Sequence, residues 1–127
     1  MVTITRIFEF EAAHSLSAHK EKCQRLHGHS YQLQVTVTGP MKRGPRSDRG
    51  MIMDFSDLKK LVQREIISKV DHVYLNESLV LYPTAENLVG WIASVLSKAL
   101  ESYSSDLILV KVRLYETSDS YAEWSKR

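Results

Sequence analysis

Three of the five histidines of this chain, His14, His27 and His29, lie close together in sequence, and the only cysteine, Cys23, lies between them. In a strand, side chains two apart point to the same face, so His27 and His29 project together. The loop 15–25 is long enough to bring His14 beside that pair. Three neutral imidazoles suit zinc, and three protein ligands leave a fourth position for water or substrate. We therefore predict a catalytic type of zinc site on these histidines.

A second interpretation of the same residues is a closed structural zinc site. Thiolate and imidazole coordinate the same metal, so Cys23 could be its fourth ligand. A His-x-His pair alone is weak evidence for metal binding. The third histidine strengthens it, because a cluster of buried imidazoles without a partner is costly. The spacing does not separate the open site from the closed one.

The residues that carry these histidines have the alternation typical of strands. Residues 3–13 alternate between apolar and polar, and His14 closes the apolar face. Residues 31–38 alternate without a break, and counting back by twos from Tyr31 reaches His29 and His27. The three histidines are thus expected at the ends of two apolar strand faces.

The C-terminal part of the chain returns to strand character. Residues 107–117 form a predicted strand, residues 118–119 supply a turn, and residues 120–124 complete a hairpin. One side of the first strand is expected to be apolar, with Ile108, Val110, Val112 and Leu114. Counting on by twos places Glu116 at the end of that side.

Two helices are predicted between the strand pairs. Asp54 is an N-cap candidate for a helix that runs to about Lys69, after a short extended piece at residues 51–53. Residues 83–84 open a second helix, in which apolar residues recur at intervals of three and four.

The element order is therefore strand, strand, helix, helix, strand, strand. This order predicts an α+β fold in a single domain, residues 1–127, with an antiparallel four-stranded sheet and two helices on one face. The edges of such a sheet are commonly covered by another chain, which favours an oligomer.

Composition excludes several classes of protein. With 43% hydrophobic and 25% charged residues and no long apolar run, the chain is expected to be neither disordered nor bound to a membrane. The net charge of +2 is mild, and the basic segment 42–49 has the Gly, Pro and Ser content of a surface loop, so nucleic-acid binding is not expected. A single cysteine and the lack of a secretory signal predict a cytoplasmic protein.

Other residues could carry proton chemistry. Asp71 and His72 are adjacent, and in a turn the carboxylate could orient the imidazole as a general acid or base; a solvated loop pair is the alternative. Glu116 at the end of an apolar face would need a ligand with N–H donors, unless the strand end is solvated. Cys23, near the predicted zinc, could act as a base, serve as a fourth ligand, or have no role.

Six motifs spread over nearly the whole chain resemble the 6-pyruvoyltetrahydropterin synthase / 6-carboxytetrahydropterin synthase (QueD) family. In order they are Phe10-x-Ala12-Ala13-His14, Cys23-x-x-x-His27-Gly28-His29, Met51-x-x-Asp54-Phe55, Asp71-His72-x-x-Leu75-Asn76, Pro83-Thr84-x-Glu86-Asn87 and Tyr115-Glu116-Thr117. The gap between Cys23 and His27 is similar to that of the carboxytetrahydropterin branch.

The resemblance implies a T-fold (tunnelling fold), in which subunits join their sheets into a barrel and two rings stack into a hexamer, a dimer of trimers. It implies a lyase that converts 7,8-dihydroneopterin triphosphate to 6-carboxytetrahydropterin with release of acetaldehyde and triphosphate, a precursor step for queuosine-type 7-deazaguanine nucleosides. The alternatives are 6-pyruvoyltetrahydropterin synthesis, which stops at triphosphate elimination, and a non-catalytic zinc- or pterin-binding oligomer.

The resemblance also implies a role for each candidate residue. Zinc would lie on His14, His27 and His29. Cys23 would accept a proton, with Asp71 and His72 assisting proton transfer. Glu116 would hold the pterin ring, and Thr84 and Glu86 would line its pocket.

Overall fold

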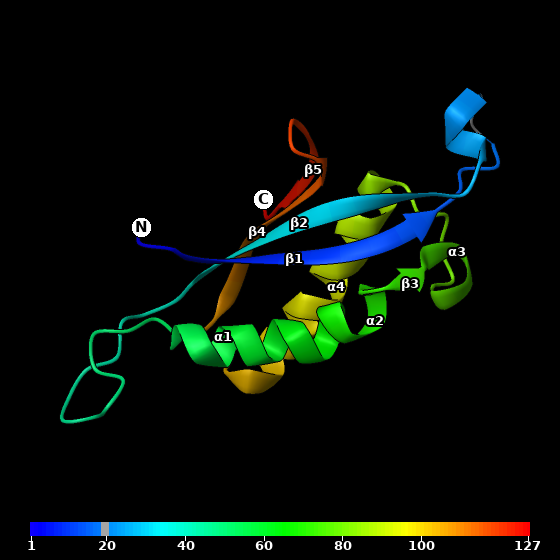
Figure 1. Ribbon diagram of the computed structural model, residues 1–127. Helices are drawn as coiled ribbons and strands as arrows, with labels where there is room; N and C mark the ends of the chain where they lie inside the picture. Colours follow the sequence, from blue (N-terminus) through cyan, green and yellow to red (C-terminus); the bar gives the residue numbers. More distant parts are fainter. Residues whose placement is uncertain (19–20) are drawn as a thin grey trace.

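A computed structural model describes residues 1–18 and 21–127 (Figure 1). Its elements, in chain order, are β1 (Ile4–His14), the 3₁₀ helix η1 (Glu21–Gln24), β2 (His27–Thr38), α1 (Phe55–Val62), the π-helical turn η2 (Gln63–Ile67), α2 (Ser68–Val70), β3 (Val73–Tyr74), α3 (Leu75–Ser78), α4 (Ala85–Tyr103), β4 (Ile108–Thr117) and β5 (Ser120–Ser125).

The described strands form one sheet in the order β3-β1-β2-β4-β5. The pairs β1–β2, β2–β4 and β4–β5 are antiparallel, as predicted. The prediction of a purely antiparallel four-stranded sheet is wrong, because β3 adds a fifth strand that pairs in parallel with β1 at Ala12 and Ala13. Two residues are too few to produce a period in the sequence, so β3 gave no signal.

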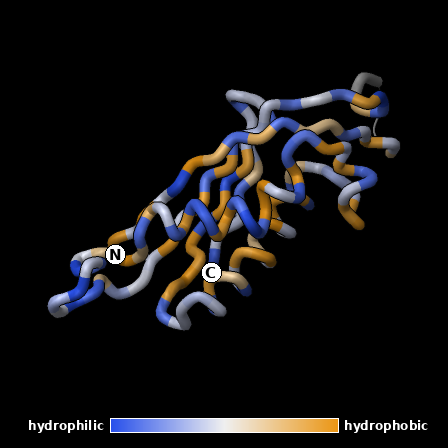
Figure 2. The backbone as a smooth tube through the Cα atoms, turned by 60° about the horizontal axis from the view of Figure 1, so that its bottom comes forward, coloured by the Kyte–Doolittle hydropathy of each residue, from blue (hydrophilic) through white to orange (hydrophobic). Residues whose placement is uncertain are grey.

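The predicted alternation in the first two strands is confirmed. Phe8, Phe10 and Ala12 of β1 are buried, and so are the alternate residues of β2 from Tyr31 onward. Figure 2 shows the hydropathy alternating along these strands. In the β1–β2 ladder His14 lies opposite His27, and Ala12 lies opposite His29. The ladder therefore brings the three histidines to one end of the strand pair.

The predicted apolar side of β4 is partly wrong. Val112 and Leu114 are buried as predicted, but Ile108 is 43% exposed and Leu109 is buried. The β2–β4 register shifts between Thr36 and Val37, so that Val110 has no partner on β2. This β-bulge exchanges the two faces of the strand before Val110. The residues after the bulge keep the predicted phase.

Both predicted helices are present, the predicted N-cap of the first is confirmed, and the second begins at the predicted place. Asp54 Oδ1 accepts a hydrogen bond from the Ser56 backbone N–H at 2.7 Å at the start of α1. The helical path continues through η2 and α2 to Val70, close to the predicted end. Thr84 Oγ1 accepts from the Asn87 N–H at 3.1 Å at the start of α4. Ile52 and Met53 form a bend, and no strand is assigned at the predicted extended piece 51–53.

The helices α1 and α4 lie on the same side of the sheet (Figure 1). Their buried side chains and the inward faces of the strands form one hydrophobic cluster, which includes Leu33, Leu58, Leu96 and Leu114. Within the described part of the chain, no helix has the length and apolar character needed to cross a bilayer. The site lies at the end of this layered core where β1 ends and β2 begins.

Candidate metal and ligand site

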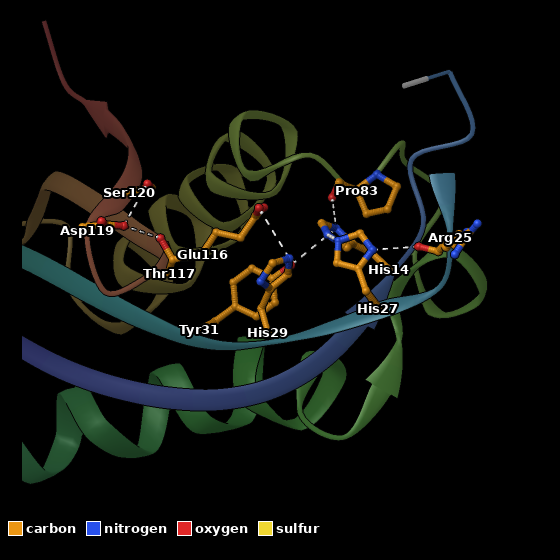
Figure 3. A network of polar contacts seen from close by, with 10 residues as sticks. All are labelled: His14, Arg25, His27, His29, Tyr31, Pro83, Glu116, Thr117, Asp119 and Ser120. Carbon is orange, nitrogen blue, oxygen red and sulfur yellow. Dashed lines mark hydrogen bonds and ion pairs between the residues drawn. The ribbon is translucent and has the colours of Figure 1, made fainter. Parts of the chain in front are cut away.

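The three predicted metal ligands come together in the structure. His14, His27 and His29 each offer a ring nitrogen, and these atoms lie within 4.8 Å of one another. Nε2 of His14 is 2.9 Å from Nε2 of His27. The ring centroids are 4.5 to 5.0 Å apart, and His14 is completely buried. Figure 3 shows the three rings converging from β1 and β2.

Backbone carbonyl groups fix the protonation of two of these rings. Nδ1 of His14 donates to the carbonyl oxygen of Pro83 at 2.8 Å, and Nδ1 of His27 donates to that of Arg25 at 2.7 Å. A neutral imidazole carries one hydrogen, so both Nε2 atoms are left with lone pairs. Two lone pairs that face each other at 2.9 Å repel unless a cation lies between them. The arrangement is the one that carbonyl groups impose on metal-binding histidines.

The third histidine completes the same argument. Nε2 of His29 is buried and has no hydrogen-bond partner among the described residues. Burial is the main reason that the pKa of His29 lies below its ordinary value; Glu116 opposes this shift, and His14 and His27 add to it. This shift favours the neutral imidazole, which is the form that binds a metal. The donor set fits a divalent ion such as zinc.

The metal-binding group in the described residues does not include Cys23. The free thiol instead lines a cavity of about 700 Å³ together with Thr84, Glu86 and Glu116. This cavity lies between the first half of α4 and β5. The geometry favours an open three-histidine site over a site closed by the thiol.

Glu116 connects this cavity to the histidines. Its Oε1 lies 3.5 Å from Nε2 of His29, and its side chain points toward the ring in Figure 3. The residue lies in a register shift of the β4–β5 pairing, between Tyr115 and Thr117. The bulge and the phase of β4 after Leu114 direct the carboxylate inward, as the count by twos predicted.

Asp71 and His72 form the predicted turn before β3. Asp71 Oδ1 lies 2.9 Å from His72 Nδ1 and accepts the backbone N–H of Glu11 at 3.0 Å. The Glu11 hydrogen bond is the main cause that lowers the pKa of Asp71, and His72 contributes. His72 has a φ of 58°, an uncommon conformation for a residue with a side chain, and its N–H donates to the Glu11 carbonyl at 2.6 Å. The backbone thus presents the imidazole to solvent.

The structure does not bring all predicted residues into one cavity. His72 lines a cavity of about 520 Å³ with His29 and Tyr74, whereas Cys23 and Glu116 line the larger one. The His72 side chain is 77% exposed. Among the described residues, one chain therefore brings together the three candidate metal ligands and Glu116, and the Asp71–His72 pair lies apart from Cys23.

The groups that support the three histidines were not predicted from the sequence. The carbonyl oxygens of Pro83 and Arg25 hold two ligand rings, and no sequence pattern identifies a carbonyl partner. Asn76 accepts the Ser15 N–H and donates to the Ser15 carbonyl, both at 2.9 Å, which fixes the chain just after His14. Asn76 belongs to one of the six motifs, and this was the sequence signal that could have identified it as a supporting residue.

A family model described as 6-pyruvoyl tetrahydropterin synthase matches residues 3–127. The 6-carboxy-5,6,7,8-tetrahydropterin synthase of Synechocystis sp. is 44% identical over 100 residues, which cover 78% of this chain and 78% of that protein. The dihydroneopterin monophosphate aldolase of Pyrococcus furiosus is 34% identical over 110 residues, covering 87% of this chain and 85% of the aldolase. Among solved structures, the Caenorhabditis elegans 6-pyruvoyl tetrahydropterin synthase is similar with a TM-score of 0.77 and 26% identity, covering 99% of this chain and 96% of that one.

Proposed function

The chain belongs to the 6-pyruvoyl tetrahydropterin synthase family, and on this premise we propose that it is a 6-carboxytetrahydropterin synthase. The proposed reaction converts 7,8-dihydroneopterin triphosphate and one water molecule to 6-carboxytetrahydropterin, acetaldehyde and triphosphate. The observation that carries the proposal is the cluster of His14, His27 and His29, whose lone pairs face one point beside a cavity lined by Cys23 and Glu116. The similarity to the Synechocystis synthase supports the choice of product.

The proposed cofactor is zinc, held by the three histidines. When bound there, zinc would act as a Lewis acid toward the vicinal hydroxyl groups of the substrate side chain. The protein contributes the fixed orientation of the rings through the Pro83 and Arg25 carbonyls. Because these carbonyls hold Nδ1–H in place, Nε2 of His14 and Nε2 of His27 need no rearrangement to bind.

The proposed proton acceptor is Cys23, since its thiol lines the same cavity as Glu116. A general base must lie within hydrogen-bond reach of the proton that it removes, and the Cys23 side chain lines the cavity in which Glu116 would hold the ligand. Asp71 and His72 form a second proposed proton-transferring pair, in which the carboxylate, 2.9 Å from Nδ1, orients the imidazole. Thr84 and Glu86 complete the wall of the pterin pocket.

We further propose that the site is completed in an oligomer, a hexamer of two stacked rings. Within the described residues, β5 has a free outer edge, and β1 pairs with β3 only at Ala12 and Ala13. A free edge on each side allows the sheets of neighbouring subunits to join in a ring. Such joining would also bring the Asp71–His72 pair of one subunit toward the Cys23 cavity of the next. We place this oligomer in the cytoplasm, in a queuosine-type pathway.

The test of the proposed function is product analysis. The purified protein with zinc is incubated with 7,8-dihydroneopterin triphosphate, and the products are identified by mass spectrometry and an acetaldehyde assay. We expect 6-carboxytetrahydropterin and one acetaldehyde per turnover. Formation of 6-pyruvoyltetrahydropterin without acetaldehyde would instead show the pyruvoyl activity. A parallel incubation contains dihydroneopterin monophosphate in place of the triphosphate. Turnover of the monophosphate and not of the triphosphate would relate the chain to the Pyrococcus aldolase. No turnover of either compound would favour a binding protein.

A Glu116→Ala variant is expected to raise KM by about 10- to 100-fold, because hydrogen bonds to a charged group contribute about 1.5–3 kcal/mol each. The carboxylate would accept hydrogen bonds from the N–H groups at the amino-pyrimidine edge of the pterin. Steady-state kinetics over a range of substrate concentrations measure the change. Glu101→Ala, on the exposed end of α4, is the control and should leave KM unchanged. A normal KM in the Glu116 variant would disprove the anchoring role.

A further inference from the structure

Tyr31 is a buried residue of the site that has no part in the function proposed above. It lies on β2, two residues after His29 and on the same face, and it is 1% exposed. Its ring stacks on that of Phe10 with 4.8 Å between centroids and 8° between planes. It also meets the rings of His14 and His29 edge-on, at 6.3 and 5.6 Å (Figure 3). The phenol ring is therefore fixed against two of the three imidazoles.

The Tyr31 hydroxyl makes a polar contact with one metal ligand. Its oxygen lies 3.5 Å from Nδ1 of His14. That nitrogen carries a hydrogen, because its closer partner is the Pro83 carbonyl oxygen at 2.8 Å, which can only accept. The Tyr31 oxygen is therefore a second acceptor beside the same N–H. Two acceptors restrict the rotation of the ring more than one does, and the ring plane sets the direction of the Nε2 lone pair.

The phenolic hydrogen needs an acceptor of its own. Nδ1 of His14 cannot accept it, because that nitrogen is itself a donor. Tyr31 lines a cavity of about 650 Å³ together with His29 and Glu116. The Glu116 carboxylate is an acceptor within that cavity. Tyr31 thus contacts His14 and lines the same cavity as the carboxylate proposed to hold the pterin.

We infer that Tyr31 is a positioning residue for the metal site, whose hydroxyl holds the His14 imidazole in its metal-binding orientation. The inference rests on the zinc site of the proposed function and assigns it a further residue. A cation on Nε2 draws electron density from the ring and makes Nδ1–H a stronger donor, so the second acceptor matters most in the loaded protein. A phenylalanine at this position keeps every ring contact and removes only the hydroxyl.

The test compares the zinc affinities of the wild-type chain, Tyr31→Phe and Tyr115→Phe. Affinity is measured by competition with a chromogenic zinc chelator, which requires no substrate and no turnover. Removal of a group that orients a metal ligand typically weakens binding about 10- to 100-fold, and we expect about 10-fold for Tyr31→Phe. Tyr115 lies on the neighbouring strand, and its hydroxyl accepts from Arg113 at 3.3 Å; among the described residues it makes no hydrogen bond to the three histidines. Its variant should bind zinc as the wild type does.

The outcomes separate a positioning role from other causes. Wild-type affinity in Tyr31→Phe would overturn the inference, because the ring alone would then be sufficient. Equal weakening in both variants would also overturn it, since the effect would then be general to the sheet. Thermal unfolding of the zinc-free proteins checks that both variants fold. If the wild-type chain itself bound no zinc, the proposed metal site would fail and this inference with it.

Discussion

A His27→Ala variant is expected to lose bound zinc and catalytic turnover together. His27 supplies one of three ring nitrogens that lie within 4.8 Å of one another, and two ligands hold zinc far more weakly than three. The Lewis-acid contribution of a metal is several kcal/mol, so we expect kcat to fall by about a thousandfold or more. Metal content after dialysis, measured by atomic emission, and turnover of 7,8-dihydroneopterin triphosphate check the two effects.

The control for this variant is His72→Ala. His72 is also a histidine near the end of the sheet where β1 ends and β2 begins. Its side chain is 77% exposed, however, and it lies outside the candidate metal-binding group. It should keep its zinc even if its turnover falls. Full zinc occupancy in His27→Ala would contradict the three-histidine site. Loss of zinc from both variants would show that the measurement reports the stability of the protein instead of ligation.

The convergence of the three histidines could be predicted because they follow strand periodicity. The alternation in residues 31–38 extends back through His29 to His27, and that of β1 ends at His14. An antiparallel ladder then places His14 opposite His27, as observed. Glu116 followed from the same count on β4. Wherever the period of two is unbroken, position along the strand sets the face on which a side chain lies.

The failures occur where that periodicity is interrupted. The bulge at Val110 changes the face of Ile108 and Leu109, and a bulge adds one residue without a distinctive sequence signal. The strand β3 is two residues long and depends on the β1 edge, which lies about sixty positions earlier in the chain. The carbonyl groups of Pro83 and Arg25 belong to the backbone, which every residue has, so residue type does not reveal their contacts. Such features become visible only when distant segments are placed in space.

The family membership expected from the six motifs is confirmed by the match over residues 3–127. The motifs are informative because their residues meet in the fold although they lie far apart in sequence. Asn76 contacts Ser15, and the carbonyl of Pro83 contacts His14. Two motifs thus support His14 and the residue after it at the end of β1. Their joint occurrence identified the family better than any one motif could.

A Cys23→Ala variant is expected to lose turnover while it keeps its zinc. Cys23 lines the cavity that contains Glu116 and is not part of the metal-binding group in the described residues. A positioned general base contributes about 10²- to 10⁴-fold to the rate, so kcat should fall by that factor. KM should change little, because Glu116 and the other groups proposed to hold the pterin remain. Metal content and steady-state kinetics of the same preparation measure both quantities.

This variant separates the three interpretations of Cys23 that the sequence left open: a proton acceptor, a fourth zinc ligand, or a residue without a role. If the thiol closes the zinc site as a fourth ligand, Cys23→Ala must weaken zinc retention, and chelator competition would detect it. If the thiol accepts a proton, zinc affinity stays at the wild-type value and only the rate falls. Cys23→Ser adds a matched control, because serine keeps the size of the side chain but its hydroxyl is a far weaker acid than a thiol. Wild-type turnover in both variants would exclude Cys23 as the base and would require another proton acceptor in the cavity.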